Sequence, residues 1–160
     1  IEGAQEPTVV VREDQDQGDS RVSPDGRWIV YESRQSGQLE VFVRPFPAGT
    51  GKWQVSTGGG VKPLWAPRGD EIYWISGGRM FAISVEASGS GLSLGRPRML
   101  FEIPPGRRGD TDFLAHDLSP DGSRFLMTRV ANPELSRRRI DLILNWSEQI
   151  RGLEKKGISQ

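Results

Sequence analysis

Apolar residues occur along this chain in short runs that are separated by turn-forming residues. The runs are rich in β-branched and aromatic side chains and are bounded by Gly, Pro, Asp and Ser, a pattern typical of antiparallel strands. None repeats every three or four residues over a dozen positions, as an amphipathic helix would. The pattern predicts strands near residues 20–23, 28–33, 39–45, 53–56, 62–65, 72–76, 80–85, 98–101, 114–118, 125–130 and 140–145.

One short phrase recurs three times just before a strand. It consists of a small residue, Pro, a polar residue and Gly, followed by an apolar run. The copies begin 43 and 53 residues apart, and a repeat of about this length is typical of a β-propeller blade or of a helical-pair repeat. Because no helical periodicity accompanies the phrase, we expect propeller blades. The three copies are Ser23-Pro24-Asp25-Gly26, Ala66-Pro67-Arg68-Gly69 and Ser119-Pro120-Asp121-Gly122.

The chemistry of this phrase predicts a tight turn between two antiparallel strands. Pro presets its own φ near −65°, and the Gly that follows two residues later accepts a positive φ at little cost. We therefore predict positive φ at Gly26, Gly69 and Gly122. The second copy departs from the other two, because Arg68 stands where they have Asp.

The repeats divide the chain into three blades, at about residues 20–57, 61–102 and 113–146. The first two show four strands each, and the third shows only three. One β-branched run, Thr8-Val9-Val10-Val11, precedes all three blades and belongs to none. The predicted half-propeller therefore spans residues 1–146, and residues 147–160 form a short helical or disordered tail.

These residues resemble the TolB-type, WD-like β-propellers, and more narrowly the propellers that follow bacterial serine/threonine kinase domains. The resemblance rests on the repeated turns, on Leu39-Glu40-Val41-Phe42-Val43-Arg44-Pro45-Phe46-Pro47, on the Trp53 to Gly60 phrase and on the ending Leu142–Trp146. It implies a non-catalytic platform for protein or ligand binding, such as the sensor portion of a larger receptor, in an extracytoplasmic or periplasmic setting. Such propellers usually have six or more blades, and this chain shows three.

Composition narrows the function classes. Gly and Pro number 20 and 11, in keeping with many turns, and 21 basic residues balance 21 acidic ones. A neutral chain has no overall attraction to nucleic acid. The chain has no Cys and one His, which argues against thiolate and multi-histidine metal sites, and we expect no cofactor. The start, IEGAQEPT, lacks the features of a signal peptide, and no apolar run is long enough to span a membrane.

One motif offers a different function class. Gly91-Leu92-Ser93-Leu94-Gly95 matches the Gly-x-Ser-x-Gly nucleophile elbow of serine hydrolases, and His116 and Asp112 would complete a triad on paper. An elbow needs an apolar strand before it and a helix after it, and here Ala87-Ser88-Gly89-Ser90 and Arg96-Pro97 flank the motif. We therefore expect Ser93 in an exposed polar loop, and keep a small serine esterase as the alternative.

His116 has a simpler interpretation as a strand side chain that lines the propeller channel or packs at a blade boundary. The five tryptophans recur at comparable points in the blades, so we expect most of them to pack between blades. They are Trp28, Trp53, Trp65, Trp74 and Trp146.

Three blades in an arc would leave two blade faces bare, and a propeller removes such edges by closing into a ring. We therefore predict a homodimer in which two chains form one six-bladed ring. The run from Thr8 through Val9 and Val10 to Val11 would pair with Ile140 and Leu142 of the other copy, with Glu13 and Asp14 near the basic stretch from Arg137 to Arg139. The other possibility is that the chain is half of a larger propeller and has no activity alone.

Overall fold

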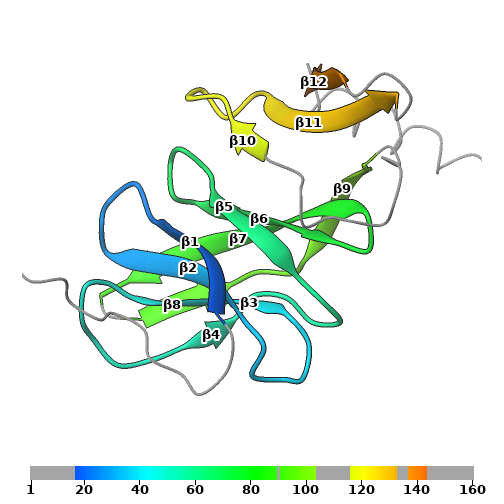
Figure 1. The fold of residues 1–160 in the computed structure, drawn as a ribbon. Helices are drawn as coiled ribbons and strands as arrows, with labels where there is room; N and C mark the ends of the chain where they lie inside the picture. The colour runs from blue at the N-terminus through cyan, green and yellow to red at the C-terminus, as the bar shows by residue number, and fades with distance from the viewer. Residues whose placement is uncertain (1–16, 90, 104–115, 133–136, 144–160) are drawn as a thin grey trace, which may run out of the picture.

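The computed structural model describes residues 17–89, 91–103, 116–132 and 137–143, and these residues form strands and turns with no helix (Figure 1). All strand pairs are antiparallel and fall into three groups along the chain. The all-β class predicted from the short apolar runs is confirmed. Most strands begin and end within two residues of the predicted positions, because turn residues fix both ends.

The first sheet has four strands in the order β1-β2-β3-β4. They are β1 (Gln17–Val22), β2 (Trp28–Ser33), β3 (Glu40–Pro45) and β4 (Trp53–Gln54). The pairing of β2 with β3 is regular from Trp28↔Pro45 to Ser33↔Glu40. The side chains of β2 are buried along its whole length, as expected for a central strand that packs on both faces.

The second sheet has five strands in four positions. They are β5 (Val61–Trp65), β6 (Glu71–Ser76), β7 (Arg79–Ser88), β8 (Gly91–Leu94) and β9 (Arg98–Glu102). The first half of β7 pairs with β9 and its second half with β8. The break between β8 and β9 falls at residues 95–97, where Pro97 has no N–H to donate to a ladder. The outer edge of this blade is thus one return strand in two pieces.

The third sheet has the order β10-β11-β12 in the part of the chain that is described. Its strands are β10 (His116–Leu118), β11 (Phe125–Asn132) and β12 (Arg137–Ile143). The predicted N-terminal run at residues 8–11 and the predicted helical tail both lie outside the described residues, so those two predictions stay open.

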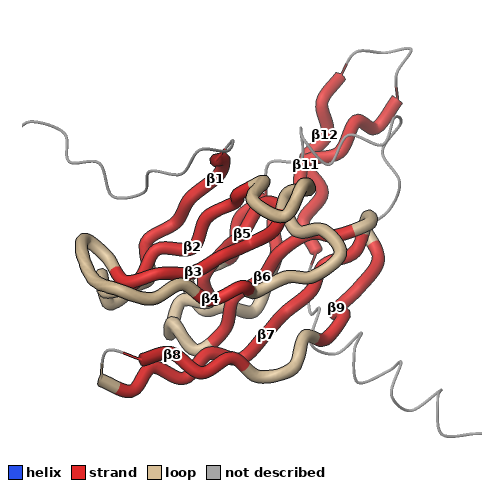
Figure 2. Tube along the Cα trace, turned by 90° about the horizontal axis from the view of Figure 1, so that it is seen from below, coloured by secondary structure: helices blue, strands red, loops and turns tan. Residues whose placement is uncertain are grey.

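Figures 1 and 2 show the strands of the three sheets along the fold. Two apolar clusters join the sheets to one another. The first lies between the first and second sheets and includes Trp28, Trp65 and Trp74, with Trp53 packed against it. The second lies between the second and third sheets and is centred on Tyr73 and Phe125, whose rings meet edge to face at 5.2 Å. Four of the five tryptophans therefore pack between blades as predicted, and Trp146 lies outside the described residues.

The three repeated turns adopt the predicted conformation. Gly26, Gly69 and Gly122 have φ of 72°, 74° and 72°. In each turn the Gly N–H donates to the carbonyl of the first residue of the phrase, at 2.8–2.9 Å. The turn prediction is confirmed at all three positions, because local chemistry alone determines this geometry.

Candidate functional site

The turn between β1 and β2 is held by a network of side chains. The Ser23 hydroxyl donates to Asp25 Oδ1 at 2.5 Å and accepts from the Trp28 N–H at 3.0 Å. The other Asp25 oxygen accepts from Arg27 Nε at 2.7 Å. This arrangement fixes the carboxylate and the guanidinium at the end of the first blade.

The hydrogen bond from Ser23 is the main reason that the pKa of Asp25 falls to about 2, and the bonds and charge of Arg27 contribute in the same direction. The turn between β10 and β11 has the same hydrogen bond from a serine hydroxyl to its aspartate. Ser119 donates to Asp121 at 2.5 Å and, with the Ser123 amide, lowers the pKa of Asp121 to about 2. Both carboxylates are therefore charged over the whole physiological pH range.

The turn between β5 and β6 is built differently. Ala66 has no hydroxyl, and Arg68 at the third position forms an ion pair with Asp70 at 2.8 Å. The Arg68 side chain is 85% exposed. A conformation set by Pro67 and Gly69 thus tolerates a change of charge at the third position, because that side chain points to solvent.

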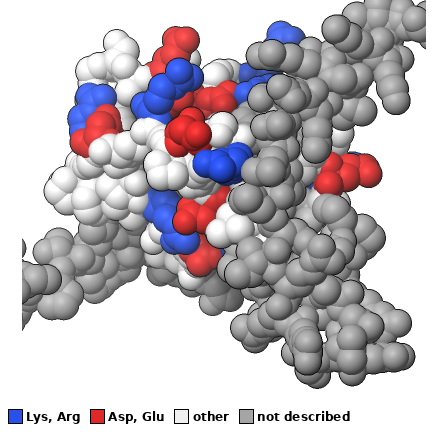
Figure 3. Space-filling model, turned by 90° about the horizontal axis from the view of Figure 1, so that it is seen from above, with Lys and Arg blue, Asp and Glu red and all other residues white. Residues whose placement is uncertain are grey.

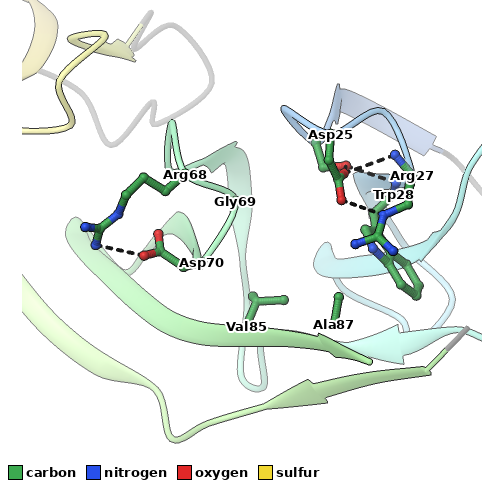
Figure 4. A pocket seen from close by; sticks show the side chains of 9 residues that line it. Asp25, Arg27, Trp28, Arg68, Gly69, Asp70, Val85 and Ala87 are labelled. Atoms are coloured by element: carbon green, nitrogen blue, oxygen red, sulfur yellow. Dashed lines mark hydrogen bonds and ion pairs between the residues drawn. The ribbon is translucent and has the colours of Figure 1, made fainter. Parts of the chain in front are cut away.

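A hollow of about 230 Å³ lies between the first and second turns (Figure 4). Its floor is the second half of β7, through Val85 and Ala87, and the two turns form its walls. The lining residues are Ser23, Asp25, Arg27, Trp28, Arg68, Gly69, Asp70, Val85 and Ala87. The sequence analysis did not find this hollow, because it depends on how two turns 43 residues apart in the chain meet over a third segment.

The hollow carries no net charge. Each wall contributes one Arg–Asp pair, and the floor is apolar. The same balance extends over the face seen from above, where acidic and basic side chains lie intermixed (Figure 3). Electrostatics therefore favour neither an anionic nor a cationic partner, and any binding here rests on shape and on individual hydrogen bonds.

A second polar cluster lies where β1 meets β5. Lys62 forms an ion pair with Asp19 at 2.5 Å, and its N–H donates to the buried carboxylate of Glu32. Lys62 has φ of 57°, unusual for a residue other than glycine. The cluster joins the first two sheets through polar contacts, next to their apolar cluster.

Glu40 forms a third cluster and is 1% exposed. Its carboxylate accepts from the Gly58 and Gly59 amides at 2.9 and 2.8 Å, from Gln38 at 2.8 Å and from the Ser56 hydroxyl. These bonds satisfy a buried charge and fix the segment between β4 and β5. The sequence marks Glu40 as an acidic residue within an apolar strand, but it does not identify the glycine amides as its partners.

The expectation that Ser93 lies in a polar loop is wrong in one respect. Ser93 is exposed, but it lies in strand β8 and pairs with Glu86 of β7. Leu92 and Leu94 point to the first apolar cluster, so the motif alternates inward and outward as a strand does. The sequence analysis missed β8 because glycines flank it. The structure shows strand pairing at this motif, in place of the strand–turn–helix of a nucleophile elbow.

His116 begins β10 in the third sheet and is half-buried. Figure 1 shows β8 and β10 on opposite sides of β5 and β6, so Ser93 and His116 belong to different parts of the fold. Asp112 lies outside the described residues. The structure therefore does not bring the three residues of the alternative triad together in its described part.

Some of the predicted interface residues lie outside the described residues, and the others lie in β12. Thr8, Val9, Val10 and Val11 lie outside the described residues. Arg137, Arg139, Ile140 and Leu142 lie in β12, where each pairs with a residue of β11. Their role in contact with a second chain stays a prediction.

The described part of the chain contains no helix long and apolar enough to cross a membrane. It also contains no group of three or more His, Asp or Glu side chains placed to hold a metal ion.

The stacked antiparallel sheets define a β-propeller type of fold. The chain is similar to the crystal structure of TolB from Acinetobacter baumannii, with a TM-score of 0.61 and 15% identity over 88% of this chain and 32% of that one. It thus spans about a third of the length of that structure. A protein from Bacteroides uniformis provisionally assigned as a 6-phosphogluconolactonase has a TM-score of 0.48 and 14% identity over 84% of this chain and 42% of that one.

No protein-family model and no curated protein sequence matches the chain. The likeness to TolB supports the TolB-like propeller fold expected from the repeated turns. At 15% identity it concerns the fold alone.

Proposed function

We propose that the chain is a non-catalytic propeller module that binds a partner in the hollow between its first two turns. The observation that carries this proposal is the hollow itself, whose walls are fixed by hydrogen bonds and whose floor is a strand. Sites on rigid elements hold their geometry without a partner and lose little entropy on binding. In a larger receptor such a module would serve as the sensor portion.

The size of the hollow favours one class of partner. Pockets for drug-sized ligands measure roughly 300–1,000 Å³, and this one measures about 230 Å³. It therefore suits one side chain of a protein partner better than a whole metabolite. The apolar floor of Val85 and Ala87 favours a small aliphatic side chain, and the polar walls can bond the backbone on either side of it.

The test uses a panel of blocked pentapeptides that differ only in the central residue, titrated into labelled protein and followed by amide NMR shifts. We expect aliphatic peptides to shift amides in residues 23–28, 68–70 and 85–87. Ala87→Trp, which fills the floor, should abolish the shifts, and Glu86→Trp on the other face of β7 is the matched control. Shifts unchanged in Ala87→Trp, or no shift with any peptide, would refute the site.

The alternative, a serine esterase, is tested separately with p-nitrophenyl acetate. We expect the same background hydrolysis for the wild-type protein and for Ser93→Ala. Turnover that disappears in Ser93→Ala would establish the hydrolase and overturn the non-catalytic assignment.

We also infer that two copies of the chain close one six-bladed ring. The support is the difference between sheets, because the first has four strands and the third has three in its described part, with β12 at the edge. An unpaired edge strand invites another strand, and the run at residues 8–11 has the composition for it. We expect light scattering to give the mass of a dimer, and deletion of residues 1–12 to give monomer or aggregate. A monodisperse monomer of the intact chain contradicts the inference.

A further inference from the structure

The two joints between blades share the same contact at their turns. A Cβ placed on Gly69 would lie 3.7 Å from Cδ of Pro24, and one placed on Gly122 would lie 3.4 Å from Cδ of Pro67. The glycine of each turn thus rests on the proline of the turn before it. Among the described residues, no atom lies within 4 Å of such a Cβ on Gly26, so in this part of the chain no preceding proline contacts the first turn.

The central strands of the sheets also repeat one arrangement, in which alternate side chains face the preceding and the following sheet. Ile72 and Trp74 point toward the first sheet, and Phe125 and Met127, which occupy equivalent positions in the third repeat, point toward the second. The alternate positions face the other way, toward the following blade. They are Trp28 and Val30 in the first sheet and Tyr73 and Ile75 in the second.

Because Phe125 and Met127 face the second sheet, Leu126 between them faces the opposite side, where a following blade would lie. It is the counterpart of Val30 and Tyr73, which are 0% and 3% exposed, whereas Leu126 is 39% exposed. Its partner in the register is Leu142 of β12. The third blade therefore presents the contacts of a blade joint with an apolar side chain uncovered.

We propose that this face binds the first blade of a second copy of the chain, with Gly26 resting on Pro120 and with Ile29 and Tyr31 facing Leu126. Ile29 and Tyr31 stand at the positions of Ile72 and Trp74, so the first blade carries the side chains that this joint uses. The joint would continue the two interfaces already present within the chain. The proposal rests on the inferred ring and names the surfaces that meet in it.

Before this joint can form, the first blade must lose contacts that bury Ile29 and Tyr31 in the single chain. Ile29 and Tyr31 are 9% and 2% exposed in the single chain. Among the described residues, Lys52 lies over part of this face, with its ammonium 4.1 Å from the centroid of the Phe42 ring. Breaking these contacts costs free energy, which is subtracted from the free energy of association. We therefore expect a dimer that dissociates on dilution.

The first experiment measures mass against concentration for Leu126→Asp. Met99→Asp is the matched control, because this side chain is 47% exposed and lies in β9 of the second sheet. We expect the apparent dissociation constant to rise at least tenfold for Leu126→Asp and to stay unchanged for Met99→Asp, with melting temperatures confirming that both variants fold. Equal effects in the two variants, or none in Leu126→Asp, would overturn the proposed face and leave the inferred ring standing.

The second experiment places the photo-crosslinker p-benzoylphenylalanine at position 126 of the full chain. We expect a crosslinked dimer whose crosslinks map to residues 23–31 of the other copy, and no crosslinked dimer with the same group at position 99. Crosslinks to residues 116–127 of the other copy would mean that two third blades meet, which overturns this proposal. A monomer without crosslinks at high concentration overturns both this proposal and the ring.

Discussion

At the scale of single residues, glycine shapes all three repeated turns, and aspartate stabilises the first and the third. The three turn glycines share φ near 72° but differ in what an added Cβ would meet. A left-handed conformation costs a residue with a Cβ roughly 1–2 kcal/mol. Backbone strain and contact with the preceding proline can therefore be separated by substitution.

We predict that Gly26→Ala, Gly69→Ala and Gly122→Ala each lower the free energy of unfolding by about 1 kcal/mol. With valine the loss should grow to about 1–2 kcal/mol at Gly26 and exceed that at Gly122, where Pro67 lies 3.4 Å from the added Cβ. Urea unfolding of these five variants measures both effects. Equal losses for valine at Gly26 and Gly122 would show that the contact with proline is unimportant.

A second prediction concerns pH. The pKa of Asp25 lies near 2 in the folded chain, below its usual value of 3.8, so its charged form stabilises the fold above about pH 4 and this contribution is lost as pH falls toward 2. Asp25→Asn should therefore be less stable than wild type at pH 7, with the difference shrinking below pH 4. Urea midpoints at several pH values test this, and Asp121→Asn should behave alike. A difference that does not change with pH would contradict the assignment.

At the scale of elements, β8 shows that a polar, glycine-flanked segment can be a strand. Its two leucines point inward, and Leu92 is 8% exposed in the first apolar cluster. Ser93 between them is exposed. The strand is stabilised by these leucines and by pairing with the second half of β7.

We predict that Leu92→Ala costs about 2–4 kcal/mol, as expected for a leucine removed from a packed core. Ser93→Ala should change stability by no more than about 0.5 kcal/mol, because its side chain faces solvent. Thermal unfolding of the two variants provides the comparison. Similar small effects at both positions would indicate a loosely held segment.

At the scale of the whole molecule, the sheets depend on one another through their two apolar clusters. Phe125 is fully buried and contacts the rings of Tyr73 and Phe101 of the second sheet, at 5.2 and 5.5 Å between centroids. Phe125 therefore links the third sheet to the second.

We predict that Phe125→Ala lowers stability by about 3–5 kcal/mol and that the loss is felt first in the third sheet. Hydrogen exchange should quicken in β10 and β11 while amides of β2 and β3 stay protected, because the first cluster does not include Phe125. Met99→Ala is the control at an exposed site. A uniform loss of protection in all sheets would show that the blades unfold as one unit.

Much of this fold follows from local sequence. The turns at Gly26, Gly69 and Gly122 and the strand at residues 28–33 were predictable, because proline, glycine and β-branched residues set backbone angles within a few positions. The packing of Trp28 and Trp74 between blades was also predicted, although the two do not occupy equivalent positions in their repeats, because Trp74 aligns with Tyr31.

Only the tertiary structure decided the strand β8, the network around Glu40 and the hollow above Val85. Each of these depends on segments distant in the chain that meet in space: β8 needs β7 beside it, and Glu40 needs the amides of Gly58 and Gly59. Local preference cannot specify such contacts, because the free energy that selects them comes from burial and hydrogen bonding that exist only once the sheets have packed together.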